Sequence, residues 1–347
     1  MDIDIRKIGR AGRITLHRPK ALNALTYPMA VAIEKALHDW RGDDGVDLVI
    51  IDAEGEKAFC AGGDIQDLYD TAAAGDFEYG RTFWRDEYRL NAKVAAYPKP
   101  YIAFMQGFVM GGGVGISCHG SHRIACETTQ IAMPECGIGL VPDVGGSLLL
   151  ARAPGWLGEY LGTTGARMDA GNAIFAGFAD SYIPKGKWPD VITALEASGD
   201  PDVITKFTEL PPEPTMAADL PLIDRLFSAD SFAKILQTLQ SDTSGFADKT
   251  LETLGKKSPL SVAATPDLIR RSRGHDSIPA ALAEEFRFTY RSAEFGDFVE
   301  GIKGTIIDRS HSPVWRVENM FAVSQQMIDD MLAPLGENEL TLEGDAP

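Results

Sequence analysis

The segment GFVMGGGVGIS, residues 107–117, places a cluster of glycines between a buried strand and a helix. The strand before it is YIAFMQG (101–107), an apolar run that ends at a glycine. A second segment of this kind, FCAGGDI (59–65), follows the apolar run VDLVIIDAEG (46–55) and leads into a short helix expected in GDIQDLYDTAAAG (63–75). Glycine lets a ligand approach bare backbone, and free N–H groups at a helix start favour negative charge. Two such turns from neighbouring strand–helix units can aim two N–H groups at one oxygen atom, as an oxyanion hole requires.

Each glycine cluster by itself also fits a simpler interpretation, in which glycine only allows tight packing of strand against helix. Neither cluster is a nucleotide-binding motif. GGGVG (111–115) lacks the G-x-G-x-x-G spacing, and the chain contains no G-x-x-x-x-G-K-[ST].

Strands and helices alternate on both sides of these turns. We expect a strand in GRITLHRP (12–19), helices in YPMAVAIEKALHDW (27–40) and FWRDEYRLNAKVAAY (83–97), and two short strands in SHRIACETTQIAMPE (121–135). Repeated strand–helix units with apolar strands predict an α/β fold with a largely parallel sheet.

The strand pattern fades after about residue 200. A proline-rich connection, LPPEPTMAADLP (210–221), is followed by segments with helical periodicity. These segments are 222–240, 246–257, 266–274, 278–294 and 316–332. The sequence therefore predicts a core over 1–205, a helical C-terminal region over 206–335, and a frayed acidic tail over 336–347.

Composition limits the classes of partner. The formal net charge is −17, from 33 lysines and arginines against 50 aspartates and glutamates. Nucleic acid and anionic membrane surfaces bind basic patches, so we expect neither as a partner. An anionic small ligand needs only a few local donors and is not excluded. Hydrophobic content of 44% and charged content of 24% are typical of a soluble globular protein.

Cysteine and histidine patterns give no metal site. The four cysteines lack zinc spacing and form no CxxC pair, so we expect buried reduced thiols; they are Cys60, Cys118, Cys126 and Cys136. His119 and His122 lie three residues apart, but no third ligand of a suitable kind is near in sequence. The start of the chain resembles neither a signal peptide nor a transit peptide, and no run of about 18 apolar residues occurs. We expect a cytoplasmic protein without a metal.

Two acids stand out in the otherwise apolar and glycine-rich segment MPECGIGLVPDVGG (133–146). They are Glu135, which follows a proline, and Asp143, which follows another. A carboxylate removed from water without a partner is destabilised by several kcal/mol or shifts its pKa. Such a position is either structural, with Glu135 capping a helix and Asp143 starting a turn, or catalytic. The residues alone leave both interpretations open.

Taken in order, HRPKALNAL (17–25), KAFCAGGDI (57–65), GGGVG and MPECGIGLVPDVGG resemble the enoyl-CoA hydratase/isomerase, or crotonase, superfamily. Within it the chain most resembles the branch that hydrolyses 3-hydroxyisobutyryl-CoA. The features similar to that branch are WRDEYRLN (84–91), VGISCHGSHRIACETTQIAMPE (114–135) and GDFVEGIKGTIIDRSHSPVW (296–315). The likeness covers roughly residues 12 to 330.

The resemblance implies a crotonase-like spiral of ββα units with a helical C-terminal region, and it implies roles for single residues. Backbone N–H groups of Gly63 and Gly112 would polarise the carbonyl of a CoA thioester. Glu135 and Asp143 would be the catalytic acids, and Glu87 would join them in the substrate pocket. The residues that would border CoA are Ala61, Gly62, Asp64 and Ile65, although Asp64 also suits a helix cap. CoA would enter only as part of the acyl-CoA substrate, and no separate cofactor is expected.

Departures from the hydratase pattern favour hydrolysis. Hydratases carry one glutamate soon after the triple glycine, where this chain has Gly115, which cannot exchange protons. They usually have glycine where this chain has Asp143. The resemblance therefore predicts hydrolysis of a short-chain 3-hydroxyacyl-CoA, most of all 3-hydroxyisobutyryl-CoA in valine breakdown.

Several alternatives stay open at this point. Glu135 can act as a nucleophile or as a general base. The chain can instead be a hydratase or isomerase that uses Glu135 alone, or a crotonase-fold protein without catalysis. The basic cluster RRSRGH (270–275) can approach CoA or cover a helix end, and Arg18 and Lys20 can meet CoA phosphates or solvent. The helices after residue 206 can form a homo-oligomer or cover the surface that would form it.

Overall fold

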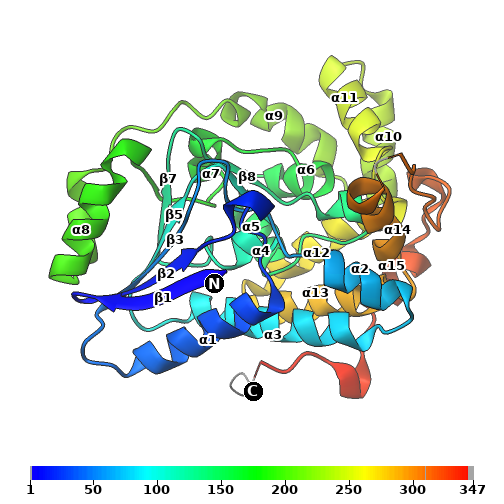
Figure 1. Ribbon diagram of the computed structural model, residues 1–347. Helices are drawn as coiled ribbons and strands as arrows, with labels where there is room; N and C mark the ends of the chain where they lie inside the picture. Colours follow the sequence, from blue (N-terminus) through cyan, green and yellow to red (C-terminus); the bar gives the residue numbers. More distant parts are fainter. Residues whose placement is uncertain (1, 309, 343–347) are drawn as a thin grey trace.

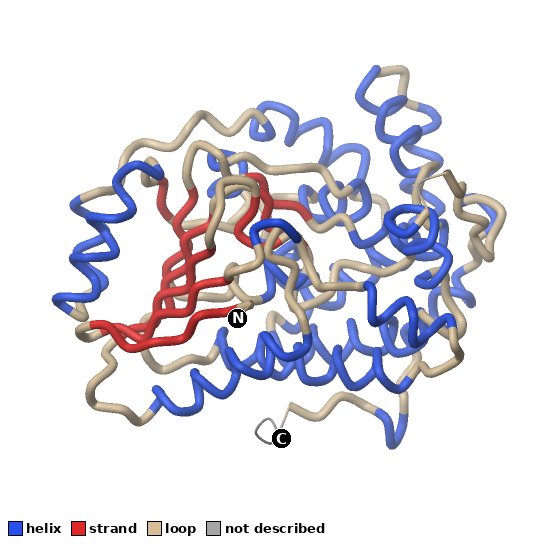
Figure 2. The backbone as a smooth tube through the Cα atoms, viewed as in Figure 1, coloured by secondary structure: helices blue, strands red, loops and turns tan. Residues whose placement is uncertain are grey.

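Two sheets form the centre of the molecule in the computed structural model, which describes residues 2–308 and 310–342. Within those residues, six strands pair in the order β1-β2-β3-β5-β7-β9 and three in the order β4-β6-β8 (Figure 2). The strands span Ile3–Ile8 (β1), Ala11–Leu16 (β2), Leu48–Ala53 (β3), Ala58–Cys60 (β4), Tyr101–Met105 (β5), Phe108–Met110 (β6), His122–Ala125 (β7), Gln130–Ala132 (β8) and Ser181–Tyr182 (β9). β1 and β2 pair antiparallel, and the other named strand pairs are parallel. The predicted α/β fold with a largely parallel sheet is confirmed.

The chain builds these sheets as a repeating spiral. In the pairs β3–β4, β5–β6 and β7–β8, the first strand joins the large sheet and the second joins the small one. A sharp bend must separate the two strands of each pair. Between β5 and β6 the bend contains Gly107, with φ of +57°, where a Cβ would lie 2.2 Å from the carbonyl oxygen of Lys57. Only glycine fits such a close approach in the left-handed region.

Helices follow each turn of the spiral and make up most of the C-terminal region (Figure 1). Their bounds are Tyr27–Arg41 (α1), Gln66–Ala73 (α2), Glu78–Ala95 (α3), Gly112–Gly115 (α4), Gly146–Arg152 (α5), Leu157–Thr164 (α6), Ala170–Phe175 (α7), Trp188–Ser198 (α8), Met216–Phe227 (α9), Phe232–Ser241 (α10), Gly245–Leu254 (α11), Pro259–His275 (α12), Ile278–Ser292 (α13), Phe298–Ile302 (α14) and Gln325–Leu332 (α15). Short 3-10 turns include Glu135–Ile138 (η2), and Lys303–Ile307 (η5) is a π-helix. No helix among the described residues is both long and apolar enough to cross a membrane.

The central strands β3 and β5 of the large sheet are buried on both faces because nearly all of their residues are apolar. Successive side chains point to opposite faces, so Ile50 and Phe104 pack with Trp188 and Val191 of α8. The neighbouring positions face the main core, which α1 and α3 cover (Figure 1). Near-continuous apolar runs such as LVII therefore indicate a doubly covered parallel strand, as the sequence predicted.

The C-terminal helices are present, but several boundaries were predicted wrongly. Segment 222–240 is two helices, α9 and α10, because the Ser231 side chain accepts a hydrogen bond from Lys234 N and caps a new helix. α9 already begins at Met216, inside the predicted connection, and contains Pro221. α12 begins at Pro259 rather than at Pro266. Each internal proline removes one hydrogen bond, and burial of the apolar face outweighs that loss.

Of the last predicted helix, 316–332, only Gln325–Leu332 (α15) is an α-helix. The part before it contains a 3-10 turn at Met320–Ala322. Arg316 N is bonded to the Asp297 carboxylate at 2.8 Å, and the Asn319 and Ser324 side chains each cap a new turn. Such local side-chain bonds compete with a continuous helix. The domain limits at 205 and 335 stay predictions, and residues 343–347 of the predicted tail lie outside the described residues.

α14 packs backbone to backbone against the turn η2, which carries Glu135. A Cβ at Gly301 would lie 2.4 Å from the carbonyl carbon of Ile138, and a Cβ at Gly139 would lie 2.4 Å from that of Asp297. The helical C-terminal region thus reaches the two predicted acids through glycine contacts that leave no room for a side chain.

We predict that Gly301→Ala lowers stability, because the added methyl group forces α14 away from η2. Overpacking of this kind typically lowers the free energy of unfolding by about 1–3 kcal/mol. Gly274→Ala is the matched control, since a Cβ there meets nothing within 4 Å and alanine favours a helix. Urea unfolding of both variants tests the contact, and equal midpoints for Gly301→Ala and the parent would contradict it.

Candidate active site

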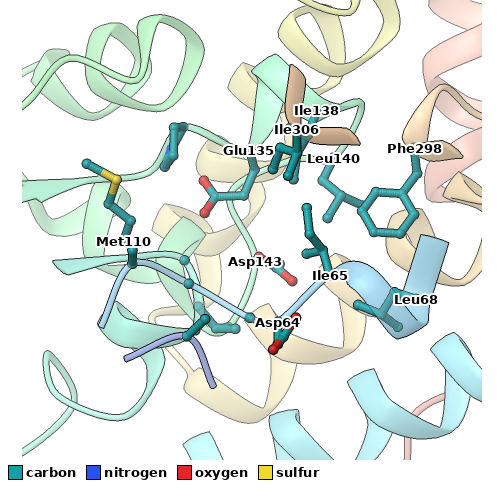
Figure 3. A pocket seen from close by; sticks show the side chains of 18 of the residues that line it. Asp64, Ile65, Leu68, Met110, Glu135, Ile138, Leu140, Asp143, Phe298 and Ile306 are labelled. Atoms are coloured by element: carbon teal, nitrogen blue, oxygen red, sulfur yellow. The ribbon is translucent and has the colours of Figure 1, made fainter. Parts of the chain in front are cut away.

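One cavity of about 640 Å³ gathers the predicted site residues. Its lining includes all nine of them, Ala61, Gly62, Gly63, Asp64, Ile65, Glu87, Gly112, Glu135 and Asp143. Parallel strands β4, β6 and β8 of the small sheet end at Cys60, Met110 and Ala132, so the turns that follow them meet at one edge. The carboxyl ends of parallel strands are where such folds bind ligands. Figure 3 shows Glu135 and Asp143 facing this space.

The two glycine turns come together as the sequence predicted. A Cβ built on Gly112 would lie 3.4 Å from Gly63 N, so the two backbones are neighbours. In the described part of the chain, neither the Gly63 nor the Gly112 N–H donates to another protein group. Gly62, with φ of +116°, and Gly111, with φ of +48°, adopt conformations that favour glycine, and the Gly63 and Gly112 that follow them both line the cavity. Two free donors side by side can bind one developing oxyanion.

Glu135 opens the turn η2 and is buried, and its Oε2 has no hydrogen-bond partner among the described residues. Its other oxygen, Oε1, lies 3.0 Å from the point where a Cβ of Gly111 would be, so the carboxyl group faces the glycine turn. Burial and the nearby charge of Asp143 raise the pKa of Glu135 well above its usual value, and Lys257 partly opposes this rise. Lys257 also lines the cavity, and the sequence analysis missed it.

Asp143 is held by a tyrosine that the sequence analysis also missed. The hydroxyl group of Tyr88, on α3, donates a 2.7 Å hydrogen bond to Asp143 Oδ2. Burial raises the pKa of Asp143 to about 6, and the bond from Tyr88 limits the rise. Tyr88 belongs to the WRDEYRLN motif, so its neighbourhood was marked in the sequence, but nothing local pairs it with a residue 55 positions away.

The turn after Asp143 is strained and firmly held. Val144 has φ of +55°, which is rare for a β-branched residue and indicates strain. His119 Nε2 contacts Val144 O at 2.8 Å, and Glu285 of α13 accepts hydrogen bonds from Gly145 N at 2.7 Å and Ser147 N at 3.0 Å. Glu285 therefore fixes the segment that carries Asp143. The sequence analysis missed Glu285, which lies 140 positions from Gly145 in a helix that reads as ordinary and amphipathic.

Glu87 lies on α3 and enters the cavity beside the oxyanion turn. Its Oε1 has no partner in the described residues and sits 2.6 Å from the position of a Cβ on Gly112. Burial and the charge of Asp143 raise the pKa of Glu87 to about 8, so the carboxyl group is protonated near neutral pH. A Cβ at position 112 would push this carboxyl group from its place.

Gly115 lies where a hydratase has its additional glutamate, and the space beside it is filled. A Cβ there would lie 2.6 Å from Asn91 Nδ2 and 2.8 Å from Val144 Cβ. A glutamate would need both neighbours to move. Position 115 therefore lacks a carboxyl group and also lacks the space for one.

The four residues predicted to border CoA line the cavity; Ala61, Asp64 and Ile65 are partly exposed, and Gly62 is buried. Asp64 Oδ2 forms an ion pair with Arg18 at 2.9 Å, and its Oδ1 accepts from Gln66 N at a long 3.5 Å. The N-cap residue of α2 is Ile65, with no side-chain cap, so the expected helix cap at Asp64 is wrong. In the basic cluster 270–275, Arg273 pairs with buried Glu159 at 2.8 Å, so this cluster holds a helix–helix contact.

Metal ligands do not gather in the described residues, where no cluster of three or more His, Cys, Asp or Glu side chains could hold an ion. His119 supports Val144, and burial lowers its pKa to about 4, so it is neutral. His122 lies apart, bonded to Ser121.

An α/β spiral, two neighbouring backbone donors and two buried carboxyl groups together are typical of a crotonase-type protein. The model of the enoyl-CoA hydratase/isomerase family matches residues 11–332, and this chain belongs to that family.

Relatives cover almost the whole chain. The mitochondrial 3-hydroxyisobutyryl-CoA hydrolase of Gallus gallus is 38% identical to it, over 98% of this chain and 91% of its own length. A crystal structure of an enoyl-CoA hydratase from Rhodobacter sphaeroides 2.4.1 is 51% identical, covers 98% of this chain and 100% of that chain, and superposes with a TM-score of 0.93. A carnitinyl-CoA dehydratase from Mycobacterium thermoresistibile is 38% identical, with 99% coverage of each chain and a TM-score of 0.94. These structures confirm the predicted crotonase-like fold with its helical C-terminal region.

Glu87 offers a test of the buried acids through stability. Because folding raises its pKa from the ordinary 4.5 to about 8, the contribution of Glu87 to stability is fully present below about pH 4.5 and is lost as pH rises through about 8. Glu87→Gln cannot ionise, so we predict that it gains stability relative to the parent between pH 5 and pH 9.

The measurement is urea unfolding at several pH values, with Glu252→Gln as the control. Glu252 is exposed and pairs with Lys256, so its replacement should give a difference that varies little over this range. A Glu87→Gln difference that is equally independent of pH would show that Glu87 is not held in its neutral form.

Proposed function

We propose that this chain hydrolyses the thioester of 3-hydroxyisobutyryl-CoA to 3-hydroxyisobutyrate and CoA, as a step of valine breakdown. The relative from Gallus gallus carries that activity in its name and matches nearly the full length. The observation that carries the proposal is the pairing of two buried carboxyl groups, Glu135 and Asp143, with a Gly115 position that has no room for a further acid.

Thioester hydrolysis suits the available groups. Thiolate is a good leaving group, so the demanding step is attack on the carbonyl carbon, which places negative charge on the carbonyl oxygen. The N–H groups of Gly63 and Gly112 would bind that oxygen, and loss of one such donor typically raises the barrier by about 2.7–4 kcal/mol. The donors are backbone groups, so they are fixed before the substrate arrives.

Glu135 would perform the attack, either directly as a nucleophile or by deprotonating water. Both routes need its ionised form, and the raised pKa makes the carboxylate a stronger base when it forms. Glu135 and Asp143 interact strongly, so their protons leave as those of a pair. Turnover should therefore rise with pH as this pair ionises.

A 3-hydroxyl group on the acyl chain would complete the pocket. Above pH 6 Asp143 is ionised and accepts a hydrogen bond, whereas Glu87 is protonated below about pH 8 and can donate one. One hydroxyl group can donate to Asp143 and accept from Glu87. This pair of complementary groups supports a 3-hydroxyacyl substrate over a simple acyl group.

CoA would extend from the mouth of the cavity along Ala61, Gly62, Asp64 and Ile65. It is part of the substrate, and we propose no separate cofactor. We also keep the cytoplasmic location and the absence of nucleic acid and membrane partners as predictions, and a homo-oligomer through the C-terminal helices stays open.

Hydration of an enoyl-CoA is the second candidate, since the crystal structure from Rhodobacter sphaeroides 2.4.1 is named a hydratase. A hydratase that follows the two-acid pattern needs an acid at position 115, and Asn91 and Val144 occupy that space. Two assays separate the reactions. Thiol release from a panel of acyl-CoA thioesters measures hydrolysis, and the ultraviolet absorbance of crotonyl-CoA measures hydration. Absence of both activities would favour a non-catalytic crotonase-fold protein.

Glu135→Gln keeps the size of the side chain and removes its charge and nucleophilicity. We predict that thiol release from 3-hydroxyisobutyryl-CoA falls by at least about 100-fold. The unfolding temperature of the variant should equal that of the parent. If such a variant releases thiol at the parental rate, the proposed mechanism is wrong.

Asp143→Asn distinguishes the two roles of Glu135. If Glu135 is the nucleophile and Asp143 serves water, the variant should accumulate an acylated Glu135, seen as added mass on the intact protein. Direct attack by water gives no adduct and a simple loss of rate.

Gly112→Pro tests the oxyanion hole, with Gly112→Ala as the matched control. Both variants add a Cβ that pushes against Glu87, but only proline removes the N–H donor, and the first position of a helix accepts proline. We predict that kcat of the proline variant is about 100- to 1000-fold below that of the alanine variant, while CoA binding survives. Equal kcat values would remove Gly112 from the oxyanion hole.

A further inference from the structure

Exposure of the lining side chains divides the cavity into an open mouth and a closed end. At the mouth the lining residues reach solvent; they are Ala21, Ala61, Asp64, Ile65, Lys257 and Ile306. At the closed end they are buried; they are Leu68, Phe83, Trp84, Glu87, Leu140 and Phe298. Trp84 and Phe298 are 3% and 1% exposed, whereas Ile306 is 48% exposed. Figure 3 shows Met110 and Phe298 at opposite ends of the lining, with Glu135 and Asp143 between them.

This asymmetry fixes the direction of an acyl-CoA in the cavity. The nucleotide is large and carries phosphate charge, so it must stay outside the mouth in water. The acyl group is at the other end of the molecule, beyond the thioester carbonyl that Gly63 and Gly112 would hold. It therefore points into the closed end.

Two aromatic residues form what we name the end wall, Trp84 of α3 and Phe298 of α14. Their ring centroids are 5.2 Å apart with an interplanar angle of 61°, a favourable edge-to-face contact. One residue comes from WRDEYRLN and the other from GDFVEGIKGTIIDRSHSPVW, so two segments more than 200 positions apart close the same space.

The end wall is held rigidly from behind. A Cβ on Gly80 would lie 3.4 Å from both Leu68 Cδ2 and Trp84 Cζ3, so this glycine lets α2 and α3 approach closely around the indole. On the other side, the carboxylate of Asp297 accepts hydrogen bonds from Ser258 Oγ at 2.6 Å and Arg316 N at 2.8 Å. These bonds fix Asp297, the N-cap residue of α14, directly before Phe298. A wall anchored in this way cannot move aside for a longer chain without disturbing packed backbone.

Resting on the proposed hydrolase function, we infer that Trp84 and Phe298 limit the acyl group to a short chain of about four carbons, branched or carrying a hydroxyl group. Each additional methylene must displace a packed aromatic ring. The wall is apolar, and the polar groups that the acyl chain would pass, Glu87 and Asp143, line the cavity nearer to the glycine turns. The pocket therefore selects an acyl group that is polar close to the thioester and apolar at its tip.

The test compares kcat/KM for 3-hydroxyisobutyryl-CoA and 3-hydroxyoctanoyl-CoA in the parent, Phe298→Ala and the milder Phe298→Leu. A hydrophobic pocket discriminates by roughly 10- to 200-fold per methylene, so we expect the C8:C4 ratio to rise by at least about tenfold in Phe298→Ala. Phe288→Ala is the control, because Phe288 is equally buried on α13 but is not among the residues that line the cavity. It should lower stability and leave the ratio unchanged.

Calorimetric binding of non-hydrolysable thioether analogues of the same two chain lengths runs in parallel. If the parent releases no thiol from any thioester, the proposed function is wrong. The ratio of the affinities for the C8 and C4 analogues then still tests the inference about the end wall. If the parent is active, the C8:C4 ratios of kcat/KM and of affinity must both be compared. The inference about the end wall is overturned if each ratio stays within about twofold of the parent in Phe298→Ala and in Phe298→Leu. A rise of the ratio in Phe288→Ala as large as in Phe298→Ala would overturn it as well, since general loosening would then explain the effect.

Discussion

Desolvation of carboxyl groups is the constraint on which the rest of this structure depends. Four acids lie fully buried around one point, and burial raises the pKa of each; they are Glu87, Glu135, Asp143 and Glu285. An isolated ionised carboxylate in such a place is strongly destabilised. Tyr88 donates to Asp143, and two backbone N–H groups donate to Glu285, so each of these two acids has its own donors. Glu87 Oε1 and Glu135 Oε2 keep no protein partner among the described residues, and both side chains line the cavity.

The buried acids differ in how many hydrogen bonds they receive from the protein, and this difference distinguishes structural acids from those available to a ligand. Glu285 serves the chain, because its bonds hold the strained turn at Val144 and Gly145 and so fix the direction of Asp143. Glu135 and Glu87 are left for a ligand, which would supply the hydrogen bonds that the protein withholds. Stored strain and unpaired polar groups are tolerated at such a site because the surrounding helices over-determine it.

Helices of the C-terminal region take part in this arrangement. α13 contributes Glu285, and α14 contributes Phe298 and packs backbone to backbone on the turn of Glu135. The spiral of strands and turns alone would supply the oxyanion donors and the two central acids but would leave one end of the cavity without a wall. Reaction type would thus reside in the spiral, and acyl-group selection in its contact with the C-terminal helices.

The meeting of the two glycine turns could be predicted from the sequence because each turn follows a strand and the two strands are neighbours in one sheet. The roles of Glu135 and Asp143 came from the resemblance between motifs. Gly63, Gly112 and Glu135 follow β4, β6 and β8, and neighbouring parallel strands bring their carboxyl ends together whatever the details of packing. The apolar strand runs likewise determined the α/β class. The spiral arrangement itself came from a resemblance between motifs and not from periodicity.

Only the tertiary structure decided which partners meet across the chain. Tyr88 finds Asp143 over 55 positions, Glu285 finds Gly145 over 140, and Trp84 finds Phe298. Helix limits around Pro221 and Pro266 were missed for the same reason, since burial outweighs a local signal. Such contacts have no period and no fixed spacing. They arise from the way whole helices pack, and that packing is set by the summed burial of many side chains rather than by any short segment.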